Sequence, residues 1–213
     1  MASKKRQTVN LLQALLLVGC ATGLPAARPA AAADVWTSLR QAQNDYQLAP
    51  GANDVQRRYI LALRDARLPA AALKVARQHP GTLTPKEYRE LEADEAAEWV
   101  RLASAPTRTQ EERFALADRA LERYDDLLGQ WHAQGLHGTD LYRRIRVDRI
   151  QALHARQRMH DVVTAYEALR LEGVAVPDYI LNEVAAAWLY LKQPEKAAAL
   201  YRVVLATDRI DDQ

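Results

Sequence analysis

Two of the five histidines are spaced as metal ligands can be. His132 and His137 lie five residues apart in a stretch that contains two glycines. Zinc sites combine histidines with cysteines or carboxylates at short spacing, and neither accompanies this pair. A solvated loop accounts for both residues, and helix ends account for His154 and His160. We therefore expect no metal site and no bound cofactor.

Nucleophilic and phosphate-binding chemistry has no support in the sequence. Serine is scarce, Cys20 is the single cysteine, and no glycine-rich phosphate loop is present. A sugar-processing helical enzyme would need a cleft carboxylate with a raised pKa, and the sequence singles out none. We expect no catalytic residue, although such an enzyme stays an open alternative.

Carboxylates crowd one short stretch of the chain. They are Glu87, Glu90, Glu92, Asp94, Glu95 and Glu98. Such a cluster is either a solvated helix face, balanced by Lys86, Arg89 and Arg101, or an acidic groove that attracts a cationic ligand. The balanced face is the expectation, and the groove is the alternative.

Four tryptophans are the remaining residues that could bind a ligand, by stacking on sugar rings. They are Trp36, Trp99, Trp131 and Trp188. Trp188 falls at a packing position of a helical repeat, so we expect it in the core. Trp131 stands near glycines and is the better candidate for an exposed aromatic. The sequence names no binding residue.

The N-terminus has the pattern of an export signal. Lys4, Lys5 and Arg6 precede an apolar run over 9–18, and alanines 31–33 precede Asp34 as a small-residue cleavage site. The apolar run is shorter than the roughly 20 residues of a membrane span. We predict a signal peptide over 1–33 and a mature domain over 34–213.

Two details of this segment affect the interpretation. Residues 17–20 resemble a lipobox, which would place a lipid on Cys20, although removal with the signal peptide is the expectation. The first 33 residues also carry four basic residues and no acid, so the net charge of +2 leaves 25 basic against 27 acidic residues beyond them. A near-neutral body argues against nucleic acid as a partner.

Helical signals recur over the rest of the chain, and no stretch alternates with the period of a strand. About nine helices are predicted, over residues 34–49, 54–68, 69–79, 85–105, 110–129, 141–155, 160–171, 178–191 and 194–206. Thr84 with Glu87, and Thr109 with Glu112, form capping boxes. Asn53 or Asp54 is expected to cap the second helix, and Gly129 to end the fifth before a loop over 130–138.

A repeat of about 35 residues relates the last four helices. Leu153 matches Trp188 and Tyr166 matches Tyr201 at that offset, which is close to the length of a tetratricopeptide repeat. Pro69 resembles Pro194 as a helix start, and this places Leu63 opposite Trp188 as a weaker third copy. The helices over 84–129 are longer than a strict repeat allows. We predict an all-α, tetratricopeptide-like solenoid with an irregular middle.

Several phrases occur in an order that resembles a known family. They are residues 69–73, 87–94, 106–109, 124–128, 163–169 and 187–205. Together they resemble the periplasmic N-terminal region of PgaA-type porins, which export poly-beta-1,6-N-acetyl-D-glucosamine for the biofilm matrix.

The resemblance implies periplasmic helical repeats followed by an outer-membrane β-barrel. It implies that the repeats bind the polymer, whose deacetylated units are cationic, and dock a periplasmic deacetylase. No run of ten-residue alternating strands is present in this sequence, so we expect an N-terminal part or a truncated product. A lipid-anchored helical-repeat scaffold for protein–protein interaction is the alternative function.

Overall fold

The computed structural model describes the backbone of residues 29–208 and the side chains of residues 34–206. This part of the chain forms nine α-helices and no strand, as predicted. They are α2 (Pro29–Leu48), α3 (Asn53–Asp65), α4 (Pro69–Gln78), α5 (Pro85–Ala103), α6 (Gln110–Ala133), α7 (Asp140–Ala155), α8 (Met159–Leu171), α9 (Asp178–Tyr190) and α10 (Pro194–Asp208). The lipobox at Cys20 and residues 1–28 of the predicted signal peptide lie outside the described residues, so both stay predictions.

Two helix starts follow directly from side-chain chemistry. The hydroxyl of Thr84 accepts a hydrogen bond from the backbone N–H of Glu87, and the Glu87 carboxylate accepts one from the backbone N–H of Thr84. Thr109 and Glu112 make the same reciprocal bonds at the start of α6. Each capping box satisfies N–H groups that a helix start leaves without partners. Both predicted capping boxes are confirmed.

Three predicted boundaries are wrong. Helix α2 begins at Pro29 rather than at Asp34, because the intervening alanines favour the helix. Ala52 precedes α3 without a side-chain cap, and Asn53 is already helical. Gly129 does not end α6, which continues to Ala133, so the predicted loop is shorter. Trp131, two residues after Gly129, is buried, and α6 continues through it to Ala133.

Three tight turns show the repeat most directly. Arg67, Gln157 and Lys192 each adopt a left-handed conformation, with φ of 57°, 62° and 61°. After each one, a backbone N–H donates back into the preceding helix, from Leu68 to Leu63, from Arg158 to Leu153 and from Gln193 to Trp188. These are the bonds of a Schellman-type helix end. The predicted match of Leu63, Leu153 and Trp188 agrees with these turns, and the same bond also ends α6, from Leu136 to Trp131, and α8, from Val174 to Leu169.

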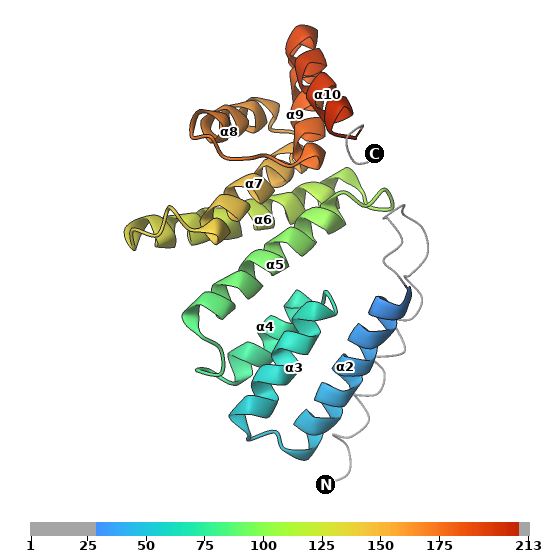
Figure 1. Cartoon of the computed structure of the whole chain (residues 1–213), viewed down its shortest axis with the longest axis vertical. Helices are drawn as coiled ribbons and strands as arrows, with labels where there is room; N and C mark the ends of the chain where they lie inside the picture. Colours follow the sequence, from blue (N-terminus) through green and yellow to red (C-terminus); the bar gives the residue numbers. More distant parts are fainter. Residues whose placement is uncertain (1–28, 209–213) are drawn as a thin grey trace.

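Helices stack in chain order, and alternate helices also touch. Each helix packs against the next along the chain, and α5 contacts α7 as α7 contacts α9. Figure 1 shows α2–α4 at one end and α8–α10 at the other, with the long helices α5, α6 and α7 between them. This stacking of pairs is the arrangement of a helical-repeat superhelix, and the predicted fold class is confirmed.

Helix α5 belongs to two hydrophobic clusters. Leu91 joins the cluster built from α2, α3 and α4, while Ala93 and Ala96 join the larger cluster that continues to α10. Helix α5 therefore connects the first three helices to the remainder of the stack. Among the described residues, no helix combines the length and the apolar character that a membrane span requires.

Candidate functional site

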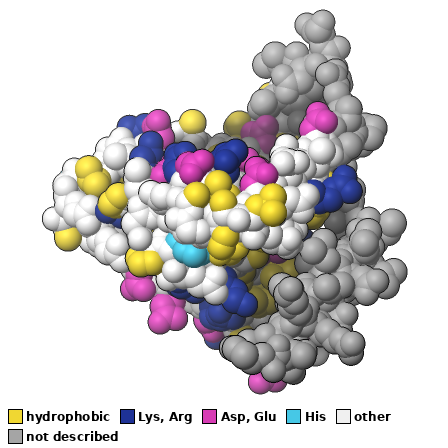
Figure 2. All heavy atoms as spheres, turned by 90° about the horizontal axis from the view of Figure 1, so that it is seen from below, with side chains coloured by type: hydrophobic (Ala, Val, Ile, Leu, Met, Phe, Trp, Pro, Cys, Tyr) yellow, Lys and Arg dark blue, Asp and Glu magenta, His cyan; other side chains and the backbone are white. Residues whose placement is uncertain are grey.

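A broad hollow lies where α4 ends and α5 begins. This groove, which we call the α4–α5 groove, has a volume of about 980 Å³. That is within the range of ligand-binding clefts, about 300–1,000 Å³. The connecting loop turns at Gly81, whose φ of +88° favours glycine, and the loop brings Pro80 and Leu83 to the groove. Figure 2 shows apolar, acidic and basic side chains side by side on the face seen from below.

The groove combines apolar and hydrogen-bonding side chains. Pro80, Leu83, Pro85 and Tyr88 supply apolar surface, and Arg77, Arg89, Glu92 and Gln130 supply polar groups. A flat apolar patch beside planar polar groups suits a sugar ring, which presents C–H groups on its faces and hydroxyls on its edge. The residues come from α4, the loop, α5 and α6, so the fold assembles the groove from three helices.

One charged group of the groove is neutralised within the protein. Burial raises the pKa of the Glu92 carboxyl, while the positive charge of Arg123 opposes that rise. Arg123 of α6 donates a hydrogen bond to Glu92. By contrast, Arg77 is exposed and makes no hydrogen bond or ion pair with the described residues, and Arg89 donates to the amide oxygen of Gln134 at 3.2 Å.

A second hollow shares Arg89 with the first. It has a volume of about 580 Å³, and we call it the Leu136 hollow. It is lined by Lys86, Arg89, Glu90, Trp131, Leu136, Gly138, Thr139, Asp140 and Leu141. Because Arg89 lines both hollows, they lie next to each other beside the N-terminal half of α5.

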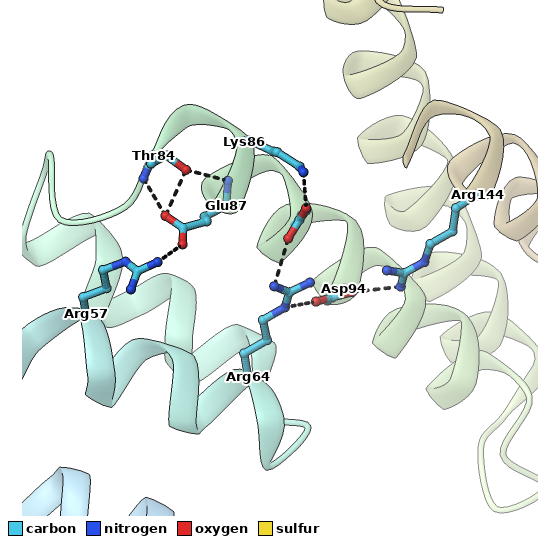
Figure 3. A network of polar contacts seen from close by, with 8 residues as sticks. Arg57, Arg64, Thr84, Lys86, Glu87, Asp94 and Arg144 are labelled. Carbon is cyan, nitrogen blue, oxygen red and sulfur yellow. Dashed lines mark hydrogen bonds and ion pairs between the residues drawn. The ribbon is translucent and has the colours of Figure 1, made fainter. Parts of the chain in front are cut away.

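Four of the six acidic residues of α5 form ion pairs with neighbouring helices. Glu87 pairs with Arg57, Glu90 with Arg64, and Glu98 with Arg101 of α5 itself. Glu95 is buried. Figure 3 shows the pair of Arg57 with Glu87 and the pairs of Arg64 and Arg144 with Asp94. The balanced face expected from the sequence is thus the better description, although most of the balance comes from α3, α6 and α7 rather than from α5.

One turn after Glu90, on the same face of α5, Asp94 begins a row of alternating charges. The Asp94 carboxylate accepts hydrogen bonds from Arg64 of α3 at 2.6 Å and from Arg144 of α7 at 2.8 Å. Arg144 also donates to Asp148 at 3.3 Å. Beneath this row lies the hydroxyl of Tyr124, which is fully buried and has no hydrogen-bond partner among the described residues. Burial and the charge of Asp148 raise its pKa well above the usual value.

Comparison with known proteins identifies the relatives of this chain. No family model matches it. Over 161 residues, or 73% of the chain, it is 38% identical to the poly-beta-1,6-N-acetyl-D-glucosamine export protein of Escherichia coli strain K12. The corresponding protein of Escherichia coli O157:H7 matches equally. The chain is related to the poly-beta-1,6-N-acetyl-D-glucosamine export proteins. It spans 19% of the length of these curated relatives, and the resemblance drawn from the sequence is confirmed.

In this relative of the export proteins, the aromatic residues divide between core and surface. Trp188 is buried, as predicted, and the nitrogen of Lys196 lies 4.1 Å from the centre of its ring. Trp131 is also buried, so its prediction as an exposed aromatic is wrong. Its side chain packs in the last turn of α6, and this packing extends the helix past Gly129. Trp36 is half-exposed, and the Arg119 guanidinium covers Trp99 at 4.4 Å.

His154 and His160 lie at helix ends, as the sequence predicts, whereas His132 lies in the last turn of α6 and not in the predicted loop. The Nδ1 atom of His154 lies against the Glu183 carboxylate. The rings of His132 and His137 lie 5.1 Å apart. No group of three or more metal-ligating residues occurs among the residues that the structure describes.

Sequence reasoning did not find the groove residues of this export-protein relative. Arg77, Arg89 and Gln130 lie on three different helices and share no spacing or motif. The available signal was indirect, since Pro80, Gly81 and Pro85 mark the loop that shapes the groove.

Proposed function

We propose that this chain is the helical-repeat part of an outer-membrane porin that exports poly-beta-1,6-N-acetyl-D-glucosamine. In this role it faces the periplasm, holds the passing polymer and catalyses no reaction. The similarity to the export proteins supports the polymer as ligand. The observation that carries the proposal is the pair of neighbouring hollows, the α4–α5 groove and the Leu136 hollow, which share Arg89.

Two neighbouring open hollows suit successive units of a linear chain of sugars better than a single small molecule. Tyr88 and Pro80 offer apolar contacts for ring faces, and the guanidinium and amide groups of Arg77, Arg89 and Gln130 donate hydrogen bonds. Carboxylates occur in both hollows, Glu92 in the α4–α5 groove and Glu90 and Asp140 in the Leu136 hollow. Arg123 pairs with Glu92, and Arg64 pairs with Glu90.

Binding of short N-acetylglucosamine oligomers with β-1,6 linkage tests the proposal. The double variant Arg77→Ala with Gln130→Ala removes two exposed donors without touching the core. Each lost hydrogen bond costs about 0.5–1.5 kcal/mol, so the loss of two should lower the affinity about 5- to 150-fold in calorimetry. The matched control is Lys74→Ala, which changes an exposed cation of α4 outside the groove and should leave the affinity unchanged. If the wild-type chain binds no oligomer, polymer binding by this chain is ruled out.

A second role, docking of the periplasmic deacetylase, is favoured by the last helix pair. Leu189, Tyr190, Val203 and Leu205 are 47–66% exposed on α9 and α10. Leu189 and Tyr190 end α9, and Val203 and Leu205 lie near the end of α10, so they form two exposed apolar groups. Large apolar side chains left exposed can mark protein–protein contact sites. Changing Tyr190 and Leu205 to serine should weaken binding of the purified deacetylase, while Leu48→Ser on α2, which is also exposed, should not. Equal binding by both variants would remove this role.

A further inference from the structure

The charges that line the α4–α5 groove restrict which form of the polymer it can hold. Two guanidinium groups, those of Arg77 and Arg89, border the groove. The carboxylate of Glu92 faces it too, but the Glu92 side chain is only 15% exposed and Arg123 already binds it. No other carboxylate lines the groove. Burial raises the pKa of the Glu92 carboxyl, and the charges of Arg77 and Arg89 also act on this carboxyl and oppose that rise. Arg77 is exposed, so a ligand in the groove meets its positive charge.

Acetylated and deacetylated glucosamine units differ in the charge of their nitrogen group. An acetylated unit carries a neutral acetamide, whose carbonyl oxygen accepts hydrogen bonds and whose methyl group is apolar. A deacetylated unit carries an ammonium group, which offers only donors. Arginine also offers only donors, so the ammonium group finds no acceptor in Arg77 or Arg89 and is repelled by both.

The remaining lining fits the acetylated form. Arg89 is partly buried, and its guanidinium presents several N–H donors in one plane, which suits a carbonyl oxygen. Leu83 and Tyr88 provide apolar surface for the acetyl methyl group. Glu90, the acidic neighbour of Arg89 in the chain, is occupied by Arg64 at 3.0 Å and by Lys86 at 3.9 Å.

We infer that the α4–α5 groove selects acetylated over deacetylated units of the polymer. The inference rests on the proposed function and adds a chemical preference to it. Acetylated stretches would be held at the groove, while a deacetylated unit would be excluded from the position between Arg77 and Arg89.

The affinities of two oligomers that differ only in acetylation test this selectivity. Calorimetry with the full chain would compare a β-1,6-linked N-acetylglucosamine pentamer with the fully deacetylated pentamer at low and at moderate salt. We expect the acetylated pentamer to bind at least 10-fold more tightly. Because the exclusion is electrostatic, this ratio should decrease as the salt concentration rises.

Reversal of one charge gives a sharper test. Arg77→Glu introduces an acceptor for ammonium at an exposed site, and it should lower the preference for the acetylated pentamer by about 10-fold or more. Lys74→Glu makes the same charge change on the same helix, outside the groove, and should leave the preference within about 2-fold of wild type.

The outcomes separate the inference from the function on which it rests. Tighter binding of the deacetylated pentamer, or equal binding of both, would overturn the selectivity and leave polymer binding intact. Equal effects of Arg77→Glu and Lys74→Glu would show that net charge, and not the groove, sets the preference, which also overturns it. Failure of both pentamers to bind would overturn the proposed function and the selectivity together.

Discussion

The Arg64 guanidinium of α3 lies 2.6 Å from the Asp94 carboxylate of α5, and this pair joins the first three helices to the rest of the stack. Asp94 also accepts a hydrogen bond from Arg144 of α7. One carboxylate thus connects three helices that belong to two hydrophobic clusters. The side chains of Arg64 and Asp94 are 26% and 20% exposed, so solvent screens this pair less than a pair on the open surface.

Asp94→Asn should destabilise the chain by about 1–3 kcal/mol, because a hydrogen bond to a charged group loses its ionic part at two arginines. Urea unfolding followed by circular dichroism would measure the change. Asp125→Asn is the matched control. The Asp125 side chain is 56% exposed and pairs with Arg149, so this variant should cost less than about 1 kcal/mol. Equal costs for the two variants would show that Asp94 has no special connecting role.

The sequence alone predicts most of the fold, and local chemistry explains why. Thr84 and Thr109 start helices through bonds within four residues, and the turns after Leu63, Leu153 and Trp188 repeat one local pattern. Such features depend on neighbours in the chain, so they are visible without the structure.

The site is much less predictable, because it depends on contacts between distant residues. Trp131 looks exposed beside its glycines, yet the packing of α5 and α7 around α6 buries it. The acidic residues of α5 look like a surface for cations, yet arginines 26–50 positions away pair with Glu90 and Asp94. No local pattern specifies which arginine reaches which carboxylate.

Gly129→Ala should stabilise the chain by about 0.5–1 kcal/mol. Gly129 lies inside α6, where glycine costs backbone entropy that alanine does not. An added Cβ would meet nothing within 4 Å, so no steric cost opposes the gain. Thermal or urea unfolding would measure the increase.

Gly173→Ala serves as the comparison for this glycine and should have the opposite effect. Gly173 follows the end of α8 with a φ of +69°, a conformation that costs an L-residue about 1–2 kcal/mol. Space is available around both glycines, so the contrast isolates backbone conformation. Destabilisation by Gly129→Ala would mean that α6 is not continuous through this position.

Tyr124→Phe should leave the chain as stable as wild type or more stable by about 1 kcal/mol. The hydroxyl of Tyr124 is buried without a partner among the described residues, and such a group carries a desolvation cost of about 1–3 kcal/mol. Tyr46→Phe is the matched change, because the Tyr46 hydroxyl lies 2.6 Å from Nε2 of His79. That variant should lose about 0.5–1.5 kcal/mol. A loss at Tyr124 equal to that at Tyr46 would show that the buried hydroxyl is hydrogen-bonded in solution.

Asp148→Asn should stabilise the chain at neutral pH and lose this effect in acid. Burial raises the pKa of Asp148, and the nearby charge of Arg144 offsets the rise only in part. A carboxyl group whose pKa is raised in the folded state binds its proton more tightly there than in the unfolded chain. Stability therefore decreases as the pH rises from the unfolded pKa, about 3.9, to the folded pKa, and stays lower above it. Asparagine has no such dependence and still offers an oxygen to Arg144.

Unfolding measured from pH 3 to pH 7 would test this sign, with Glu87→Ala as the comparison. The backbone N–H of Thr84 lowers the pKa of Glu87, so Glu87 stabilises the chain above its unfolded pKa and loses that contribution as the pH falls through its folded pKa. Glu87→Ala should therefore be less stable than wild type at pH 7, and the difference should shrink in acid. Asp148→Asn should instead be more stable than wild type at pH 7, with a difference that also shrinks in acid. A destabilised Asp148→Asn variant at pH 7 would mean that the bond with Arg144 outweighs the burial of the charge.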